Sequence, residues 1–188
     1  MTAGRSRSHF RQLANVVRNN LENQQDWTQL QTHGDDYEPD NEQDDGGGSG
    51  SGTGTGGKRI LLSGLPPRRV YIHPDEQIEL MRAERALGNG RRIAQPPEHE
   101  WVLPMHLAET PTISQFAAIF DSIDPLPPAA VEAEAASPDE GQEEETAAQW
   151  KKWRNAKRSK RLLLAIVQDD STVVYYVMQD GIVKPRQN

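Results

Sequence analysis

The residues of this chain best suited to chemistry are its five histidines, because the sequence contains no cysteine. A histidine can transfer protons near neutral pH or bind a metal ion. These five stand singly, without the paired helical or loop spacing that a metal site requires. We expect each to be a surface or capping residue, and we predict no metal site, no disulfide and no cofactor. The five are His9, His33, His73, His99 and His106.

A nuclease site is the main catalytic alternative. Tyr71, His73 and Lys184 could supply a base, an acid and a cation for the cleavage of RNA. The sequence gives no reason for the three side chains to meet, and His73 before Pro74 is already explained as the residue that enters a helix. We therefore predict that the chain has no catalytic residue.

The densest cluster of charge is basic and lies at residues 150–161. This run, WKKWRNAKRSKR, has seven basic residues, two tryptophans and no acid. Basic side chains that contact phosphates and rings that stack on bases are the usual combination for single-stranded or looped RNA. The equally weighted alternative is an amphipathic helix that buries its tryptophans and keeps its charges solvated. The candidate RNA-binding residues are Lys151, Lys152, Trp153, Arg154, Lys157, Arg158, Lys160 and Arg161.

Composition indicates that only part of the chain folds. Its 188 residues carry a net charge of -7 and are 35% hydrophobic, below the roughly 45–50% of globular domains. Two low-complexity segments are predicted to be disordered linkers: the acidic and glycine-rich 34–57, and the Pro/Glu-rich 124–149. The blocks 8–33, 58–123 and 150–188 together have the length of one domain.

The chain shows no sign of membrane insertion or secretion. No segment approaches the roughly 20 apolar residues of a transmembrane helix. The N-terminal MTAGRSRSHF lacks the apolar core of a signal peptide. We expect a soluble intracellular protein with no membrane partner.

Apolar spacing and capping signals predict three helices. Phe10, Leu13, Ala14, Val17 and Leu21 fall on one helical face across the first block, with Ser8 as the N-cap. A second helix should enter at His73-Pro74 and stop at Gly88, and a third should begin with the capping box Thr112 to Gln115. The face predicted for the third helix is Ile113, Phe116, Ala117, Phe120 and Ile123.

Five short extended runs are predicted to form strands. They are 59–62, 69–72, 101–103, 161–167 and 172–178. Pro66 and Pro67 should break the chain after the first run, and Pro104 should end the third. The last two runs are apolar on both faces, so each face must be covered by a layer of helices or by another protein.

The C-terminal block resembles a known family. The resemblance is carried by Leu164-Ala-Ile-Val167, Asp170-Ser-Thr-Val-Val-Tyr-Tyr176, Asp180-Gly181 and Lys184-Pro-Arg-Gln-Asn188. It extends to Asn20-Leu21 with Trp27, Leu62–Pro66, Tyr71–Gln77, Trp101–Pro104 and Phe116–Asp121. These residues resemble subunit fifteen of the eukaryotic tRNA-splicing endonuclease, in its fungal form.

The resemblance implies a small α/β domain of the tRNA-endonuclease fold, with helices packed on a mixed sheet. It implies a complex of four different subunits, two of them catalytic with a Tyr-His-Lys triad, in which the subunit like this one pairs with a catalytic partner. The triad histidine of that fold lies in the C-terminal domain, and this chain has no histidine after His106. No catalytic residue is therefore carried over.

The resemblance also suggests how partners meet, because related archaeal enzymes join through a C-terminal strand added edge to edge. The two-sided strands and a late short strand at 182–183 fit this mode. We predict that the partner contact includes Val173, Tyr175, Val177, Ile182 and Val183. Whether the isolated chain forms a homodimer through the same strand stays open.

We expect a non-catalytic structural subunit of the tRNA-splicing endonuclease, which reaches precursor tRNA through the complex. The resemblance places it in the nucleus, with a cytoplasmic or mitochondrial-surface location open in fungi. The alternatives are a stand-alone RNA-binding adaptor that uses residues 150–161 and a metal-independent nuclease.

Overall fold

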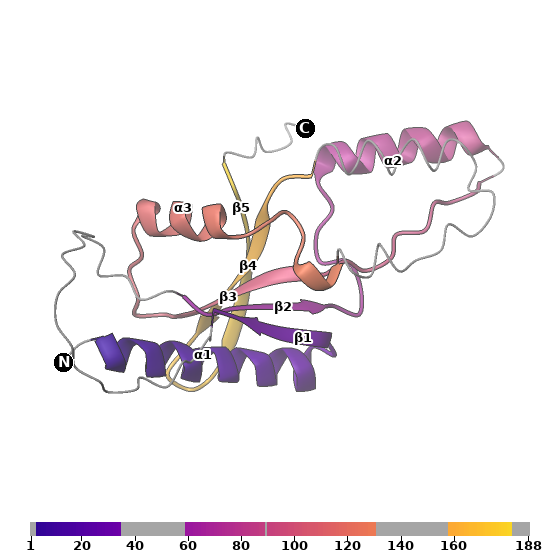
Figure 1. Ribbon diagram of the computed structural model, residues 1–188. Helices are drawn as coiled ribbons and strands as arrows, with labels where there is room; N and C mark the ends of the chain where they lie inside the picture. Colours follow the sequence, from indigo (N-terminus) through magenta and orange to yellow (C-terminus); the bar gives the residue numbers. More distant parts are fainter. Residues whose placement is uncertain (1–2, 35–58, 89, 131–157, 182–188) are drawn as a thin grey trace.

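The computed structural model describes residues 3–34, 59–88, 90–130 and 158–181 (Figure 1). In chain order its elements are α1 Ala3–Gln24, β1 Thr28–His33, β2 Leu61–Leu65, α2 Pro74–Leu87, β3 Glu100–His106, α3 Ile113–Ser122, β4 Arg161–Val167 and β5 Val173–Gln179. The predicted linker 34–57 lies outside the described residues apart from Gly34, and the predicted linker 124–149 lies outside them after Ala130.

The strands form one sheet in the order β1-β2-β3-β4-β5. β3 and β4 run parallel, and the other three neighbouring pairs are antiparallel. The parallel pair needs a crossover connection, which contains α3. The predicted α/β class with a mixed sheet is confirmed.

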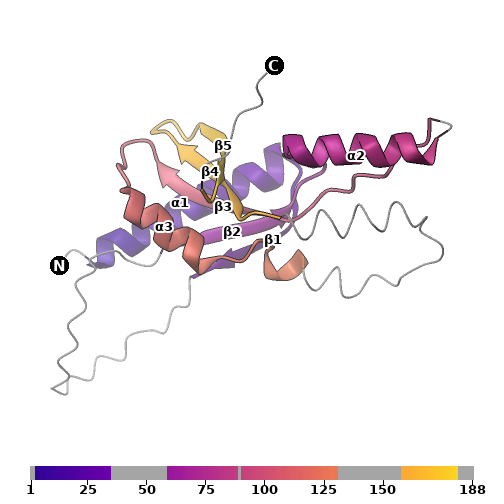
Figure 2. The ribbon, with the colours of Figure 1, turned by 90° about the horizontal axis from the view of Figure 1, so that it is seen from above.

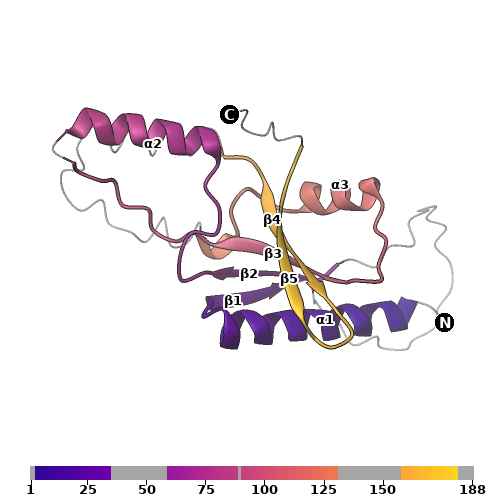
Figure 3. The ribbon, with the colours of Figure 1, turned by 180° about the vertical axis from the view of Figure 1, so that it is seen from behind.

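Helices cover both faces of the sheet, as the two-sided strands require. α1 lies along one face and α3 along the other (Figures 1 and 3). Leu163, Ala165 and Val167 of β4 belong to the core beneath α1, whereas Leu162 belongs to the core beneath α3. The alternation predicted for β4 therefore separates two hydrophobic cores.

α1 is longer than the predicted N-cap at Ser8 implied. It begins at Ala3 instead of after Ser8, because no residue at 4–8 interrupts the helix strongly. Its predicted apolar face is confirmed, with four buried residues: Leu13, Ala14, Val17 and Leu21. After the helix Asp26 has a φ of 54°, and the Trp27 N–H donates to the Leu21 carbonyl at 2.9 Å.

β1 was not predicted from the sequence. Its sequence, TQLQTH, has one apolar residue and no alternation, so its position depends on contacts made elsewhere in the fold. The register with β2 shifts between Thr28 and Gln31, and Gln29 in this irregular stretch has a φ of 54°. His33 Nε2 lies 2.8 Å from Ser63 Oγ, and His99 Nε2 lies 2.8 Å from Gln29 Oε1. These contacts fasten β1 to the sheet.

The second block differs from its prediction in three strands. The run 69–72 is not a strand, and β2 lies at 61–65 instead of 59–62, although it does end before Pro66. β3 passes through Pro104. The pairing of β2 with β3 ends at Val102. Pro104 therefore has no β2 residue opposite it, and its missing N–H leaves no hydrogen bond unmade on that side.

Both predicted helix starts in this block are confirmed. His73 Nδ1 accepts the Asp75 N–H, and Gly88 caps the other end of α2. Thr112 and Gln115 form the capping box of α3. The face of α3 differs in part, because Ile113 is 89% exposed and Ala117 is exposed while Ile119 is buried.

Packing continues past Ile123, where the sequence analysis placed the start of a linker. The Trp101 Nε1–H donates to the Asp124 carbonyl at 3.0 Å. Pro127, Ala129 and Ala130 are buried. Residues 124–130 are thus part of the folded body.

The core beneath α1 can be tested by changing leucine to alanine at one buried and one exposed position. Leu62 is fully buried, so Leu62→Ala removes packing atoms and leaves a cavity. We expect a fall of about 2–5 kcal/mol in the free energy of unfolding, measured by urea titration. Leu107→Ala is the matched control, because Leu107 is 62% exposed and its loss should change that free energy by less than about 0.5 kcal/mol. Equal effects would contradict the placement of the core.

The fastening of β1 predicts a pH dependence. Burial lowers the pKa of both His33 and His99 below 6.5. The unfolded chain therefore binds protons first as the pH falls, so the free energy of unfolding should be level above pH 6.5 and decline below it. Urea titrations from pH 5 to pH 7.5 should show a smaller decline in the double variant His33→Asn/His99→Asn. An unchanged decline would assign it to other groups.

Candidate partner interface

β5 forms an open edge of the sheet within the described part of the chain. All seven of its residues pair with β4 on one side, from Val173 opposite Val167 to Gln179 opposite Arg161. Among the strands of the described residues, none lies on its other side. An open strand edge presents main-chain N–H and C=O groups that another strand can pair with.

The register identifies the β5 residues whose main chain faces this edge. The Asp180 N–H donates to the Lys160 carbonyl, and the Gln168 N–H donates to the Thr172 carbonyl, each at 2.9 Å. In an antiparallel ladder with this register, residues 174, 176 and 178 make the hydrogen bonds to β4. The main-chain groups of Val173, Tyr175 and Val177 consequently point to the open edge.

The side chains of these three predicted interface residues have different surroundings. Val173 and Tyr175 are partly buried against the core beneath α1, and the Tyr175 hydroxyl donates to Asn20 Oδ1 at 2.7 Å. Burial raises the pKa of Tyr175 above its ordinary value. Val177 is 39% exposed and lines a small hollow with Val70 and Tyr71. The predicted Ile182 and Val183 lie outside the described residues.

Two apolar β5 residues that the sequence analysis did not choose are also exposed. Val174 is 36% exposed and Tyr176 is 57% exposed, on the face opposite Tyr175. The sequence shows that these residues alternate with the predicted ones. It does not show that α3 leaves them uncovered. The edge therefore offers apolar side chains beside its open main chain.

A buried ion cluster supports this end of the sheet. Its members are Arg69, Glu76, Glu98, Glu100, Arg158 and Arg161, each with a side chain no more than 13% exposed. Arg161 holds Glu100 with two hydrogen bonds, of 2.5 Å from Nη2 and 3.0 Å from Nε. Three positive and three negative charges balance within it.

Glu98 joins the parts of the ion cluster. It accepts from Arg158 at 2.5 Å and from Arg161 at 3.2 Å, and it lies 3.5 Å from Arg69 Nη2. Arg69 in turn donates to Glu76 of α2 at 2.9 Å. Burial opposes the charge of Arg161, but its hydrogen bond with Glu100 and the surrounding carboxylates raise its pKa. The cluster thus ties the start of β4 to β3 and to the base of α2.

The ion cluster bears directly on the predicted RNA-binding residues. Arg158 and Arg161 are engaged with carboxylates of the chain, and Lys160 Nζ donates to the Phe120 carbonyl at 3.0 Å. A phosphate would have to displace these partners. The other candidates, which are Lys151, Lys152, Trp153, Arg154 and Lys157, lie outside the described residues, so RNA binding by the run stays a prediction.

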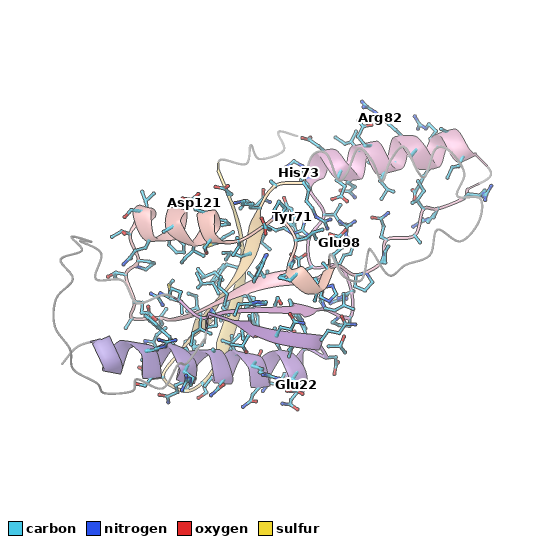
Figure 4. All side chains as sticks on the ribbon, in the orientation of Figure 1. Glu22, Tyr71, His73, Arg82, Glu98 and Asp121 are labelled. Carbon is cyan, nitrogen blue, oxygen red and sulfur yellow. The ribbon has the colours of Figure 1, made fainter. Side chains whose placement is uncertain are left out.

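The catalytic alternative receives no support from the described side chains. The rings of Tyr71 and His73 lie 6.5 Å apart, beside the base of α2 (Figure 4), and His73 Nδ1 is occupied as the helix cap at 3.2 Å from the Asp75 nitrogen. Lys184 lies outside the described residues. Among those residues no group of three or more His, Asp or Glu could hold a metal ion, and no helix is long and apolar enough to cross a membrane.

Comparison with known proteins identifies relatives of this chain. The sequence model of a family described as "Sen15 protein" matches residues 16–188. The chain is 51% identical over 180 residues to "Probable tRNA-splicing endonuclease subunit tsp-1" of Neurospora crassa, an alignment that covers 96% of this chain and 67% of the relative. It is 36% identical over 90 residues to "Probable tRNA-splicing endonuclease subunit sen15" of Schizosaccharomyces pombe, covering 47% of this chain and 50% of that protein.

The ion cluster can be tested by breaking one pair. Arg161→Met leaves Glu100 buried without its two hydrogen bonds, so we expect the free energy of unfolding to fall by about 3–5 kcal/mol. Arg82→Met is the matched control, because Arg82 is 71% exposed in its pair with Glu79, and that free energy should change by less than about 1 kcal/mol. Urea titration measures both. Similar small losses would show that the cluster adds little stability.

Proposed function

The chain belongs to the Sen15 protein family, and we propose that it serves as a subunit of a tRNA-splicing endonuclease and supports the excision of introns from precursor tRNA. The family match covers nearly the whole chain, from residue 16 to residue 188. Both relatives are named as subunits of that enzyme. This agreement is the observation that carries the proposal.

The subunit we propose is non-catalytic. A Tyr-His-Lys triad needs its histidine held by fixed geometry at the reacting group, whereas His73 serves as the cap of α2, with Nδ1 accepting the main-chain N–H of Asp75. The sequence from residue 107 to residue 188 contains no histidine. The role that remains is to build and position the complex around the catalytic partner.

The open edge of β5 is the contact that we propose for this partner. Strand addition uses main-chain hydrogen bonds for affinity, and Val173, Tyr175 and Val177 present those groups. The exposed side chains of Val174, Tyr176 and Val177 add apolar area that a partner would cover. Both faces of β4 are already occupied within the chain, so the edge is the favoured route to a second subunit.

The stand-alone RNA-binding adaptor has less support. Three of its eight candidate residues donate hydrogen bonds to groups of the same chain, and these are Arg158, Lys160 and Arg161.

The edge contact can be tested by removing a single main-chain donor. Val177→Pro deletes an N–H that points to the open edge and leaves the bonds between β4 and β5 intact. Val177→Ala is the matched control, because it trims the same side chain and keeps the N–H. Tagged full-length chains are purified from cells, and the catalytic subunit recovered with each is quantified.

We expect the proline variant to recover at least about tenfold less catalytic subunit than the wild type, and the alanine variant to recover nearly as much as the wild type. Recovery by the proline variant equal to that of the alanine variant would overturn the edge contact alone. If the wild-type chain recovers no endonuclease subunit, the proposed function is wrong.

A further inference from the structure

α2 and the segment that follows it form an arm that stands away from the sheet. We define the arm as residues 74–97, of which Asn89 is not described. In Figures 1 and 2 the helix runs outward beyond the strands, and the chain then returns to the start of β3. The side chain of Glu84 accepts the Ile93 N–H at 3.0 Å, which joins the helix to the returning chain. The base of the arm is held by the ion cluster through Glu76.

Charge is divided along the arm. Three acids lie in the first two turns of α2, which are Asp75, Glu76 and Glu79. The outer part carries four arginines, Arg82, Arg85, Arg91 and Arg92, and a single acid, Glu84. We call these four residues the arginine tip. All four are exposed, and Figure 4 shows Arg82 directed away from the body.

The turn at the end of the arm brings the two halves of the arginine tip together. Gly88 and Gly90 have φ values of 68° and 69°, a conformation that glycine adopts without strain. The Gly88 N–H donates to the Arg85 carbonyl, and the Arg91 N–H donates to the Gly88 carbonyl. Arg82 and Arg85 therefore lie before the turn and Arg91 and Arg92 directly after it.

Local stability accounts for only part of this arrangement. Arg85 is in the last turn of α2, where a cation complements the helix dipole. Arg82 has an exposed pair with Glu79, which is a weak interaction. Arg91 and Arg92 lie beyond the helix, so the dipole does not explain them.

We propose that the arginine tip contacts the phosphate backbone of the precursor tRNA, an inference that rests on the proposed function. Arginine matches phosphate in charge and in its forked geometry. The outer part of the arm carries four arginines against the single acid Glu84, so the tip is a local site of attraction for a polyanion on a chain whose net charge is -7. Arg158 is the first described residue of the basic run. Its ion pair with Glu98 places this part of the run at the base of the arm.

The test compares two variants of equal charge. The tip variant changes Arg82, Arg85, Arg91 and Arg92 to Gln. The control variant changes Arg7, Arg11, Arg18 and Arg68 to Gln, which removes the same charge from α1 and from the loop after β2. Each full-length chain is assembled with the endonuclease subunits. Binding of intron-containing precursor tRNA is then measured by fluorescence anisotropy from 50 to 300 mM salt, and thermal melting checks folding.

For the tip variant we expect RNA binding at 100 mM salt to be weaker by at least about tenfold. The slope of log affinity against log salt should be shallower by about 3, because each lost phosphate contact removes roughly 0.7 to 0.9 from the slope. The control variant should stay near wild type. If the tip variant melts early, Arg91→Gln/Arg92→Gln, which lies outside the helix, replaces it with an expected decrease of about 1.5 in slope.

Other outcomes separate the two proposals. A tip variant that assembles fully and binds RNA like the control variant overturns this inference and leaves the proposed function standing. A tip variant that loses an endonuclease subunit while the control variant keeps it overturns RNA contact in favour of an acidic protein surface. If the wild-type chain joins no endonuclease subunit, the proposed function fails, and this inference, which rests on it, is overturned with it.

Discussion

The fold depends on a balanced set of charges buried at one end of its sheet. Removing six charged groups from water is costly, and the cost is offset only while every arginine keeps its carboxylate. The partners come from separate parts of the sequence: Arg69 precedes α2, Glu98 and Glu100 precede and begin β3, and Arg161 begins β4. The ion cluster thus fixes where β4 starts against β3 and where the arm leaves the body. The positions of both proposed contact surfaces follow from it.

Because the ion cluster fixes the start of β4, it also fixes the pairing of β4 with β5 at the edge of the sheet. Leu163 lies opposite Val102 on one side and Val177 on the other. Because the pleat alternates, this register also decides which β5 residues bond to β4 and which face outward. Tyr175 combines both demands, since its main chain faces the edge while its hydroxyl bonds to Asn20 of α1. A shift of β5 by one residue would turn the main-chain groups of Val173, Tyr175 and Val177 toward β4, and residues 174, 176 and 178 would face the open edge instead.

Local signals in the sequence predicted the elements that local physics determines. The caps at His73 and Thr112 and the strand 161–167 follow from neighbouring residues and are confirmed. β1 was missed because its polar sequence becomes a strand only through distant partners such as Ser63. The basic run was correctly seen as unusual, yet the ion pair of Arg158 joins it to Glu98, 60 residues earlier. No pattern within the run indicates that pair.

Net charge is therefore a poor guide to where this molecule attracts an anion. Arg69 and Arg161 carry full charges, but each lies within bonding distance of carboxylates, so the neutral ion cluster contributes little field outside the fold. Arg92 is exposed and follows the turn at Gly88 and Gly90 in the outer part of the arm, which Figure 2 shows running outward beyond the strands. At physiological salt charges interact over only about 8 Å. An approaching polyanion would therefore respond to the local excess of arginine at the tip, whatever the charge of the whole chain.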